Sequence, residues 1–386
     1  MSARRLIYLD NASTSYPKPK SVTRAVERAV GSFGVNPGRG GYSLTRRADR
    51  LIFEARKSFA SFFNLADSSR IVFTPGGTYS LNMAIRGLLK KGDRVITTGR
   101  PHNAVVRPLY DRSAGLDITT LGGGSVSAIR ENDIASLITR RTRAVVVNHA
   151  SNVDGLLYPL GKIGRITRKL GLALIVDAAQ TAGLVEIDMK KANIDLLCVT
   201  GHKSLMGPMG IGLLAASPTI DLKPLISGGT GSFSDDEQMP ENYPDRLEPG
   251  TLNLPGIAGL AAGLKEVSRI GVRKIFAHKM KLCNKAYDAL TAMEGVTVYW
   301  PQKDSERIPL FSFNIDAWDP AEVGDILDRR YSIACRVGLH CAPRAHMEAG
   351  TYPIGSIRFA PGFYTKVSEV GAFISAVREI AGKIKR

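Results

Sequence analysis

The sequence has few cysteines, only 4 among 386 residues, and they follow no regular spacing. They are Cys198, Cys283, Cys335 and Cys341. This pattern excludes the disulfide framework of a small secreted domain. A reducing compartment suits such cysteine usage best, so we expect a cytoplasmic protein whose thiols are free or catalytic.

Long apolar runs are also missing. No segment approaches the roughly 18 consecutive apolar residues that a transmembrane helix needs. The basic N-terminus MSARRLIYLD has a short apolar run that ends at Asp10, which is too short for a signal peptide. We therefore expect no membrane partner.

The composition is otherwise that of a globular protein, with 44% hydrophobic and 23% charged residues. These values exclude extended disorder and fibrous repeats. The length favours two or three domains.

The net charge of +17 is unusual and could indicate a nucleic-acid partner. However, the basic residues are spread along the chain, and the densest groups, such as 140–143 and 383–386, are not interleaved with aromatic residues. We therefore expect no direct nucleic-acid partner. Such a charge would instead attract anionic cofactors or acidic partner proteins.

Short apolar runs alternate with amphipathic helical patterns between residues 45 and 216. The runs lie at 70–74, 94–98, 143–147, 172–176, 196–199 and 211–214. Nearly continuous apolar strands separated by helices predict an α/β fold with a mostly parallel sheet covered on both faces. In such sheets, ligands bind beyond the carboxyl ends of the strands.

Residues 227–256 are different, because they are rich in Gly, Ser, Pro and acidic residues and show little periodicity. A segment of this kind is usually functional or mobile. Helical periodicity returns at about 257, and 260–386 predicts a second, smaller α+β domain.

The first strand is followed by Pro75-Gly-Gly-Thr78 and then a helical pattern. Glycines allow close backbone approach, and a helix N-terminus offers free N–H groups, so this turn suits a phosphate. The alternative is a plain strand–helix turn. The segment matches neither G-x-G-x-x-G nor the P-loop, so NAD and ATP sites are not indicated.

Two charged residues follow later strands. Asp177 at the end of a buried strand is costly unless it is paired, and it could fix a protonated heterocycle nitrogen or simply cap the turn. Lys203 follows Thr200-Gly-His202, where burial and basic neighbours would lower its pKa and favour Schiff-base chemistry.

Cys341 lies beside His340 in a basic segment with Arg336 and Arg344. Cationic neighbours raise the thiolate fraction, as a sulfur nucleophile requires. The alternative is an inert packed thiol. A metal site is disfavoured because there is no C-x-x-C pair and the arginines oppose a cation. Its ligands would be Cys335, His340, Cys341 and His346. Arg358, in a strand-like segment, could bind a carboxylate or be an ordinary surface residue.

These segments occur in an order that resembles the cysteine desulfurases, which are class V aminotransferase-like enzymes that use pyridoxal 5′-phosphate. The resemblance runs from Tyr8-Leu-Asp-Asn-Ala-Ser13 to Gly362-Phe-Tyr-Thr365. Gly338-Leu-His-Cys-Ala342 is similar to the branch with a compact cysteine loop, which includes selenocysteine lyases.

The resemblance implies a PLP-transferase fold of type I, with a mostly parallel seven-stranded sheet. It implies a large domain at 15–256 and a small α+β domain, formed by 1–14 and 257–386, that carries the active cysteine. The cofactor site of this family is built at a dimer interface, so a homodimer is expected.

The resemblance also implies roles for single residues. Lys203 would form the Schiff base, and Cys341 would accept sulfur. His102 would stack on the ring, Asp177 would pair with its nitrogen, and Gln180 would bond its phenolic oxygen.

Other residues would bind the phosphate or the substrate. Gly77 and Thr78 match the phosphate turn, and Thr251 would reach the phosphate of the other subunit. The remaining implied contacts are Thr200 and His202 to the phosphate and ring, Asn152 to the ring and substrate, Arg358 to the substrate carboxylate, and Arg39 to the site.

The implied reaction converts L-cysteine to L-alanine, with the sulfur held on Cys341 as a persulfide before transfer to an acceptor protein, for example in iron–sulfur cluster assembly. Selenocysteine lyase (L-selenocysteine as substrate), another class V lyase or aminotransferase, and a non-catalytic nucleic-acid-binding protein are the alternatives. Two departures from the family are Tyr79, where many members are acidic, and Leu339, where this branch often has a second histidine.

Overall fold

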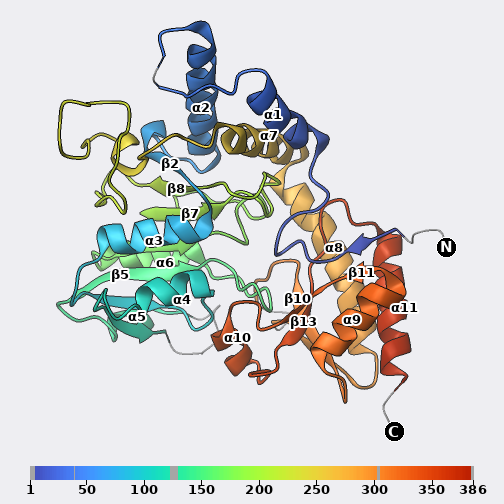
Figure 1. The fold of residues 1–386 in the computed structure, drawn as a ribbon. Helices are drawn as coiled ribbons and strands as arrows, with labels where there is room; N and C mark the ends of the chain where they lie inside the picture. Colours follow the sequence, from blue (N-terminus) through green and yellow to red (C-terminus); the bar gives the residue numbers. More distant parts are fainter. Residues whose placement is uncertain (1–4, 39, 122–128, 302–304, 384–386) are drawn as a thin grey trace.

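The computed structural model describes residues 5–38, 40–121, 129–301 and 305–383. Its main element is a seven-stranded sheet with the order β2-β8-β7-β6-β5-β3-β4 (Figure 1). The strands are β2 (Ile71–Thr74), β3 (Arg94–Thr97), β4 (Asp117–Thr120), β5 (Thr142–Asn148), β6 (Ala173–Asp177), β7 (Leu196–Thr200) and β8 (Gly212–Ala216).

Only β8 runs antiparallel to its neighbours in this sheet. The predicted α/β fold with a mostly parallel seven-stranded sheet is therefore confirmed. All six apolar runs of the sequence form strands of the sheet. The seventh strand, β4, was missed because Asp117–Thr120 is polar at three of its four positions and lies at the edge of the sheet.

Helices cover both faces because alternate strand residues point to opposite sides. Val145 and Val147 pack into one core with α2 (Ser43–Phe62), α6 (Leu160–Lys169) and α7 (Leu254–Ile270). Val146 between them packs into another core with α3 (Gly77–Leu88) and α4 (Asn103–Leu109). Two further helices complete this part, α1 (Lys20–Gly31), which packs along α7, and the short α5 (Glu131–Ala135).

A second, antiparallel sheet lies in the C-terminal part, with the order β12-β13-β10-β9. Its strands are β9 (Val296–Tyr299), β10 (Phe311–Ile315), β12 (Arg336–Gly338) and β13 (Ser356–Phe359). The helices of this part are α8 (Val272–Thr291), α9 (Pro320–Tyr331), α10 (Pro343–Glu348) and α11 (Val367–Ala381). It has a separate apolar core, to which α8, α9 and α11 contribute.

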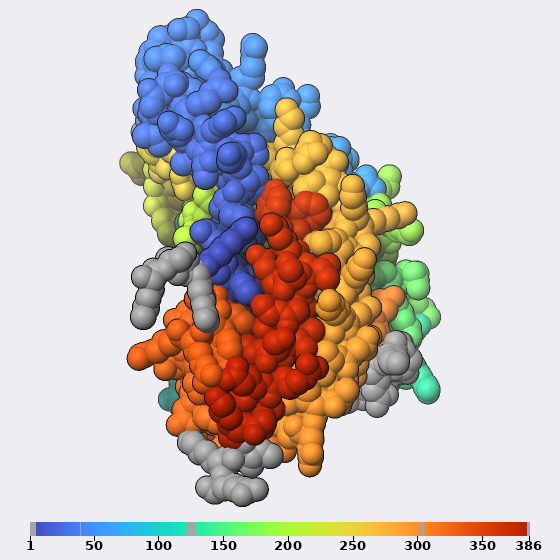
Figure 2. Space-filling model, turned by 90° about the vertical axis from the view of Figure 1, so that its right-hand side faces the viewer, coloured from blue at the N-terminus to red at the C-terminus, as the bar shows by residue number. Residues whose placement is uncertain are grey.

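The N-terminal segment packs with this C-terminal part. Strand β1 (Ile7–Tyr8) pairs in parallel with β11 (Ile333–Ala334), and Leu9 is fully buried in the C-terminal core. In Figure 2 the N-terminal segment, in dark blue, lies against the red C-terminal residues. Helix α7 packs into the first core, whereas α8 packs into the second. The domain boundaries given in the sequence analysis stay a prediction.

Between β8 and α7 the chain forms no strand and only the 3-10 turn η3 (Asp245–Leu247), in agreement with the absence of periodicity at 227–256. Another 3-10 turn, η1 (Ser68–Arg70), precedes β2. Within the described ranges no helix has the length and apolarity needed to cross a bilayer.

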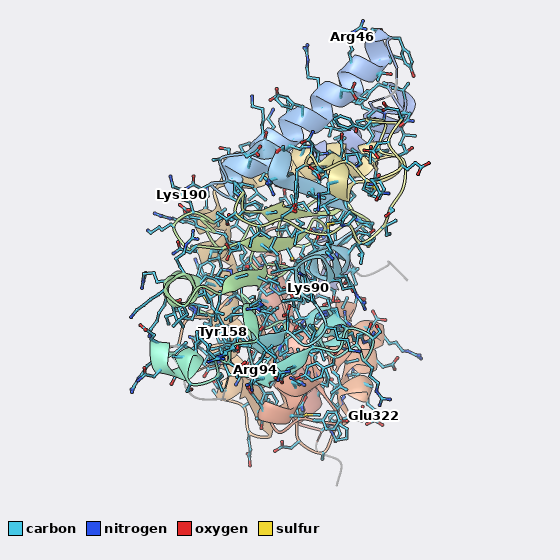
Figure 3. The ribbon with its side chains drawn as sticks, turned by 90° about the vertical axis from the view of Figure 1, so that its left-hand side faces the viewer. Arg46, Lys90, Arg94, Tyr158, Lys190 and Glu322 are labelled. Carbon is cyan, nitrogen blue, oxygen red and sulfur yellow. The ribbon has the colours of Figure 1, made fainter. Side chains whose placement is uncertain are left out.

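The positive charge is dispersed over the surface. Figure 3 shows Arg46 near one end of the molecule and Lys90, Arg94 and Lys190 at separate places on the same side. Several arginines are also paired with carboxylates, such as Arg86 with Asp111. The basic side chains labelled in this view are therefore not gathered in one patch.

The aromatic cluster of the second core makes a first prediction possible. Phe373 is fully buried, and its ring centroid lies 4.8 Å from that of Phe359 and 5.7 Å from that of Phe313. Because truncation leaves a cavity, Phe373→Ala should lower the free energy of unfolding by about 3–5 kcal/mol in urea denaturation. Phe53→Ala, which truncates an exposed ring, is the control and should have little effect.

Candidate active site

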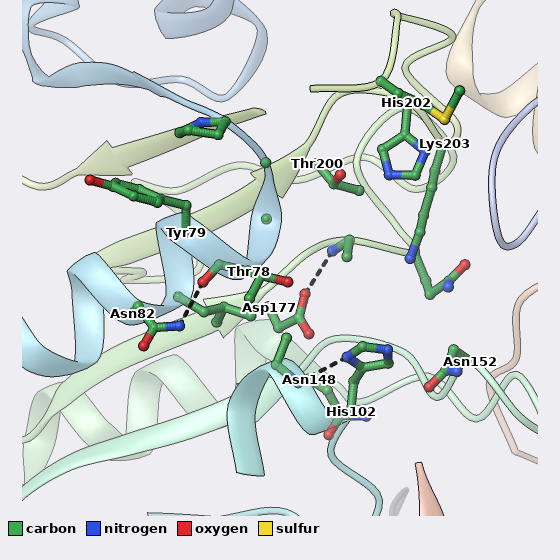
Figure 4. A pocket seen from close by; sticks show the side chains of 18 of the residues that line it. Thr78, Tyr79, Asn82, His102, Asn148, Asn152, Asp177, Thr200, His202 and Lys203 are labelled. Carbon is green, nitrogen blue, oxygen red and sulfur yellow. Dashed lines mark hydrogen bonds between the residues drawn. The ribbon is translucent and has the colours of Figure 1, made fainter. Parts of the chain in front are cut away.

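A cavity of about 640 Å³ opens at one edge of the large sheet (Figure 4). Nine of the residues proposed from the sequence line it: Gly77, Thr78, His102, Asn152, Asp177, Gln180, Thr200, His202 and Lys203. Tyr79, Asn82, Met209 and Leu225 also line it, and the sequence analysis gave none of these a role in the site.

The topology explains why distant residues meet here. Strands β2, β3, β5, β6 and β7 all run in the same direction, so their carboxyl ends share one edge of the sheet. Each strand ends in, or is followed by, residues that line the cavity. In Figure 4, Lys203, Asp177 and His102 point from three different elements toward the same space.

One side of the cavity is suited to an anion. Gly77 and Thr78 begin the 12-residue helix α3, whose first N–H groups have no helical partner. A side chain at Gly77 would place its Cβ only 3.2 Å from the Cβ of Thr200, so glycine permits the close packing of this turn on β7. His202 adds a buried Nδ1 that has no hydrogen-bond partner among the described residues. This set of donors fits a phosphate group.

Lys203 and Asp177 form the charged pair of the cavity. Burial lowers the pKa of Lys203 to about 8, although the nearby Asp177 carboxylate opposes this shift. Burial raises the pKa of Asp177, while a hydrogen bond of 2.9 Å from the backbone N–H of Ala179 to its Oδ1 favours the ionised form. A buried carboxylate with an unused oxygen can pair with a protonated nitrogen, as the sequence analysis expected for Asp177.

His102 lies at the N-terminus of α4 with a defined tautomer. The backbone N–H of Ala104 donates to its Nδ1 over 3.0 Å, so the neutral ring carries its proton on Nε2. Burial and the nearby positive charge of Lys203 lower the pKa of His102 to about 4. The ring is therefore neutral at pH 7, as a ring that stacks on an aromatic ligand should be.

Cys341 is exposed on a tight loop that is held against the cavity wall. The backbone N–H of Asn103 donates to the carbonyl of Cys341 over 2.7 Å, and the side-chain amide of Asn152 donates to the carbonyl of His340 over the same distance. His340 and Cys341 both have positive φ values, of 49° and 56°. Such conformations are unfavourable for side-chain-bearing residues and need this support from neighbouring elements.

A chain of polar contacts connects the thiol to the N-terminal segment. Arg336 Nη2 lies 3.6 Å from Cys341 Sγ, and its Nη1 donates to Ser13 Oγ over 3.0 Å. Ser13 also accepts from Arg358 Nη2 over 2.9 Å, and Arg358 pairs with Asp10 over 2.7 Å. Of the two arginines expected beside Cys341, Arg336 therefore contacts the thiol, whereas the Arg344 guanidinium lies over the Tyr110 ring, 4.5 Å from its centroid.

The N-terminal residues of this network had no role in the sequence analysis. Asp10 and Ser13 lie inside the motif that carries the family resemblance, but nothing local to them indicates which distant arginines they contact. The only available signal was that a polar Asp-Asn-Ala-Ser segment follows an apolar run directly.

Four proposed residues are not among the described residues that line the cavity: Cys341, on the loop described above, Arg358, Thr251 and Arg39. Arg358 is 1% exposed, and its Nη1 donates to the carbonyl of Asn152 over 2.9 Å, while its Nε has no partner among the described residues. Thr251 is exposed at a distance from the cavity lining, which leaves its predicted contact with a second subunit as a prediction. Arg39 lies outside the described residues.

The metal alternative finds no support. His340 and His346 lie with their ring centroids 5.3 Å apart, but His346 Nδ1 is engaged with Thr351 Oγ1. Over the parts of the chain that the structure describes, no group of three or more His, Cys, Asp or Glu residues is arranged to hold a metal ion. Burial, together with the positive charge of Arg358, lowers the pKa of His340 to about 2.

Comparison with known proteins agrees with this geometry. Residues 7–373 match the aminotransferase class-V family, so the chain belongs to that family. It is 34% identical over 383 residues to a probable cysteine desulfurase of Methanothermobacter thermautotrophicus, a match that covers 97% of this chain and 95% of the relative.

Two solved structures are similar over nearly the whole chain. The apo structure of the cysteine desulfurase from Thermococcus onnurineus has a TM-score of 0.90 at 32% identity and covers 98% of this chain and 95% of its own. The cysteine desulfurase CsdA of Escherichia coli has a TM-score of 0.87 at 27% identity, with the same coverage. The family resemblance that the sequence indicated is thereby confirmed.

The environment of His102 predicts a pH effect. Its folded pKa of about 4 lies below the value of about 6.5 expected in the unfolded chain. The neutral, buried ring therefore stabilises the fold fully above about pH 6.5, and this stabilisation is lost as the pH falls toward 4. In an NMR titration the ring signals of His102, assigned with His102→Asn, should not move between pH 8 and pH 5. A midpoint near 6.5 would contradict the buried, neutral ring described here.

Proposed function

We propose that this chain is a cysteine desulfurase that uses pyridoxal 5′-phosphate, releases L-alanine from L-cysteine and keeps the sulfur on Cys341. The observation that carries the proposal is the position of the Cys341 loop. It hydrogen-bonds to Asn103 and Asn152, beside a cavity that also contains Lys203 and Asp177. A transaminase has no need for a cation-flanked thiol at this place.

The residues present fit the cofactor. Its phosphate would lie on Gly77 and Thr78 at the N-terminus of α3, with Thr200 and His202 adding donors. Its ring would lie against His102, with Asp177 at the ring nitrogen and Gln180 at the phenolic oxygen. Pyridoxal 5′-phosphate supplies an aldehyde that condenses with amines and a ring that withdraws electrons from the attached carbon.

Two residues of the chain would handle protons and charge. With a pKa of about 8, the Lys203 amine is partly unprotonated near neutral pH, so its Nζ can accept a proton from the substrate Cα. The Asp177 carboxylate would stay ionised opposite a protonated ring nitrogen, because an opposite charge outweighs part of the burial cost.

Two further residues would act on the substrate itself. The guanidinium of Arg358, next to Asn152, would bind the substrate carboxylate. Cys341 Sγ, with the Arg336 guanidinium at 3.6 Å, would attack the substrate sulfur and hold it as a persulfide. The Sγ–S bond would form as the substrate Cβ–S bond breaks, and the electron pair of that bond would stay with the carbon skeleton, which leaves as alanine after protonation.

The proposed enzyme would be a homodimer in which Thr251 reaches the phosphate in the partner subunit's site. Arg39 would also reach the site, as the family resemblance implies. An acceptor protein would then remove the sulfur from the exposed Cys341. All four cysteines are free, and a thiol that accepts sulfur must stay reduced, which fits the expected cytoplasmic location.

The direct test is Cys341→Ser with L-cysteine, measuring alanine and sulfide. We expect both products to fall to the level of the reaction without enzyme, because serine cannot form a persulfide. Cys335→Ala is the matched control and should keep its activity, since Cys335 packs against the second core. Full activity of Cys341→Ser would exclude the proposal, and activity retained with L-selenocysteine alone would favour a selenocysteine lyase.

A second test concerns the cofactor bond. The purified protein should show the visible absorbance of a lysine-bound pyridoxal 5′-phosphate, and Lys203→Ala should lose this band because, among the residues that the structure describes, no other lysine lines the cavity. Lys18→Arg, which leaves the cavity lining intact, should retain the band. A wild-type protein that showed no visible band after incubation with pyridoxal 5′-phosphate would contradict the cofactor assignment.

A further inference from the structure

The peptide bond between His202 and Lys203 is held by the N-terminal segment. The carbonyl oxygen of His202 accepts from the backbone N–H of Ser15 over 3.0 Å and from Thr14 Oγ1 over 3.1 Å. It also accepts from Lys18 Nζ over 2.6 Å. Ser15 Oγ donates to it as well, over 3.3 Å, so four donors that lie within five residues converge on the carbonyl directly before the proposed Schiff-base lysine.

The ammonium group of Lys18 is used entirely in this contact. It also donates to Ser15 Oγ over 2.8 Å and to Thr14 Oγ1 over 3.4 Å, so its hydrogen-bond partners are one carbonyl and two hydroxyls, with no carboxylate among them. Burial lowers its pKa to about 8. A cation that is partly removed from water without a counter-ion is costly to keep, which argues for a specific use.

Lys203 needs such an anchor for a geometric reason. Its side chain is a flexible chain of four methylenes, so the position of Nζ in the cavity depends on how firmly the backbone is fixed. The turn that follows is already unusual, with φ of 59° at Met206 and a hydrogen bond from Met206 N–H to the Lys203 carbonyl over 2.9 Å. A charged donor to a partly buried carbonyl is one of the stronger hydrogen bonds available.

We propose that Lys18 is a positioning residue for the reaction, whose ammonium fixes the His202–Lys203 peptide and thereby the place of Lys203 Nζ in the cavity. Lys18 does not line the cavity and so acts through Lys203. The same N-terminal segment carries Ser13, which contacts both Arg336 and Arg358, so the lysine and the two guanidinium groups share one support. The activity part of this inference rests on the proposed desulfurase function.

The test compares Lys18→Met, Lys18→Arg and the control Lys20→Met, whose lysine is exposed two residues away. For Lys18→Met we expect kcat for alanine formation to fall by about 10- to 100-fold, with KM for L-cysteine nearly unchanged, since a displacement of about 1 Å has effects of this size. Lys18→Arg should restore most of kcat because it keeps a charged donor. Lys20→Met should behave as the wild type.

A second readout does not depend on turnover. Cofactor-stripped protein is treated with acetic anhydride, and acetylation of Lys203 is followed by mass spectrometry. Lys18→Met should change the acetylation rate of Lys203 several-fold, whereas Lys20→Met should not. If wild type forms no alanine, the proposed function is wrong, and the acetylation rates still decide the role of Lys18.

The inference is wrong if Lys18→Met has the same kcat and the same acetylation rate as the wild type. It is also wrong if Lys18→Arg is as impaired as Lys18→Met. If Lys18→Met does not fold, Lys18→Gln, which removes the charge but keeps an N–H donor, replaces it. That variant should show a smaller change in the same direction, and wild-type values of both kcat and the acetylation rate would overturn the inference.

Discussion

The buried guanidinium of Arg358 is the interaction on which the arrangement of the site depends. It pairs with Asp10 and bonds to Ser13 and to the carbonyl of Asn152, so it joins β13, the N-terminal segment and the connection after β5. An almost fully buried arginine is costly unless most of its donors are paired, as Nη1 and Nη2 of Arg358 are. The three segments are therefore held in one fixed relation, and this relation brings the Cys341 loop against the wall of the cavity.

The large sheet contributes a different kind of constraint. Its parallel strands deliver Asp177, Lys203 and His102 to one edge, where burial changes their proton affinities in directions that suit distinct tasks. The pKa of the lysine falls to about 8 and that of the histidine to about 4. One group can therefore exchange protons near neutral pH while the other remains an uncharged aromatic surface.

Asp177, Lys203 and the Gly77–Thr78 turn could be predicted without knowledge of the topology, because each lies at or just after the end of an apolar strand. His102, Asn152 and Gln180 lack such a signal and were predicted only from the family resemblance. The network of Asp10, Ser13 and Arg336 could not be predicted, because its contacts join residues more than 300 positions apart. Strand β4 was missed because it has little apolar character of its own and is stabilised by its pairing with β3 at the edge of the sheet.

The charges at the site also account for its preferred ligands. Lys203, Arg336 and Arg358 converge here, and Asp177 and Asp10 are the carboxylates that influence the pKa of Lys203. This excess of positive charge suits a phosphate together with an amino-acid carboxylate. The overall charge of +17 does not produce this effect, because surface charges separated by more than about 10 Å are screened, whereas these three cations act over short distances. Local placement of a few cations therefore matters more for the proposed chemistry than the net charge of the chain.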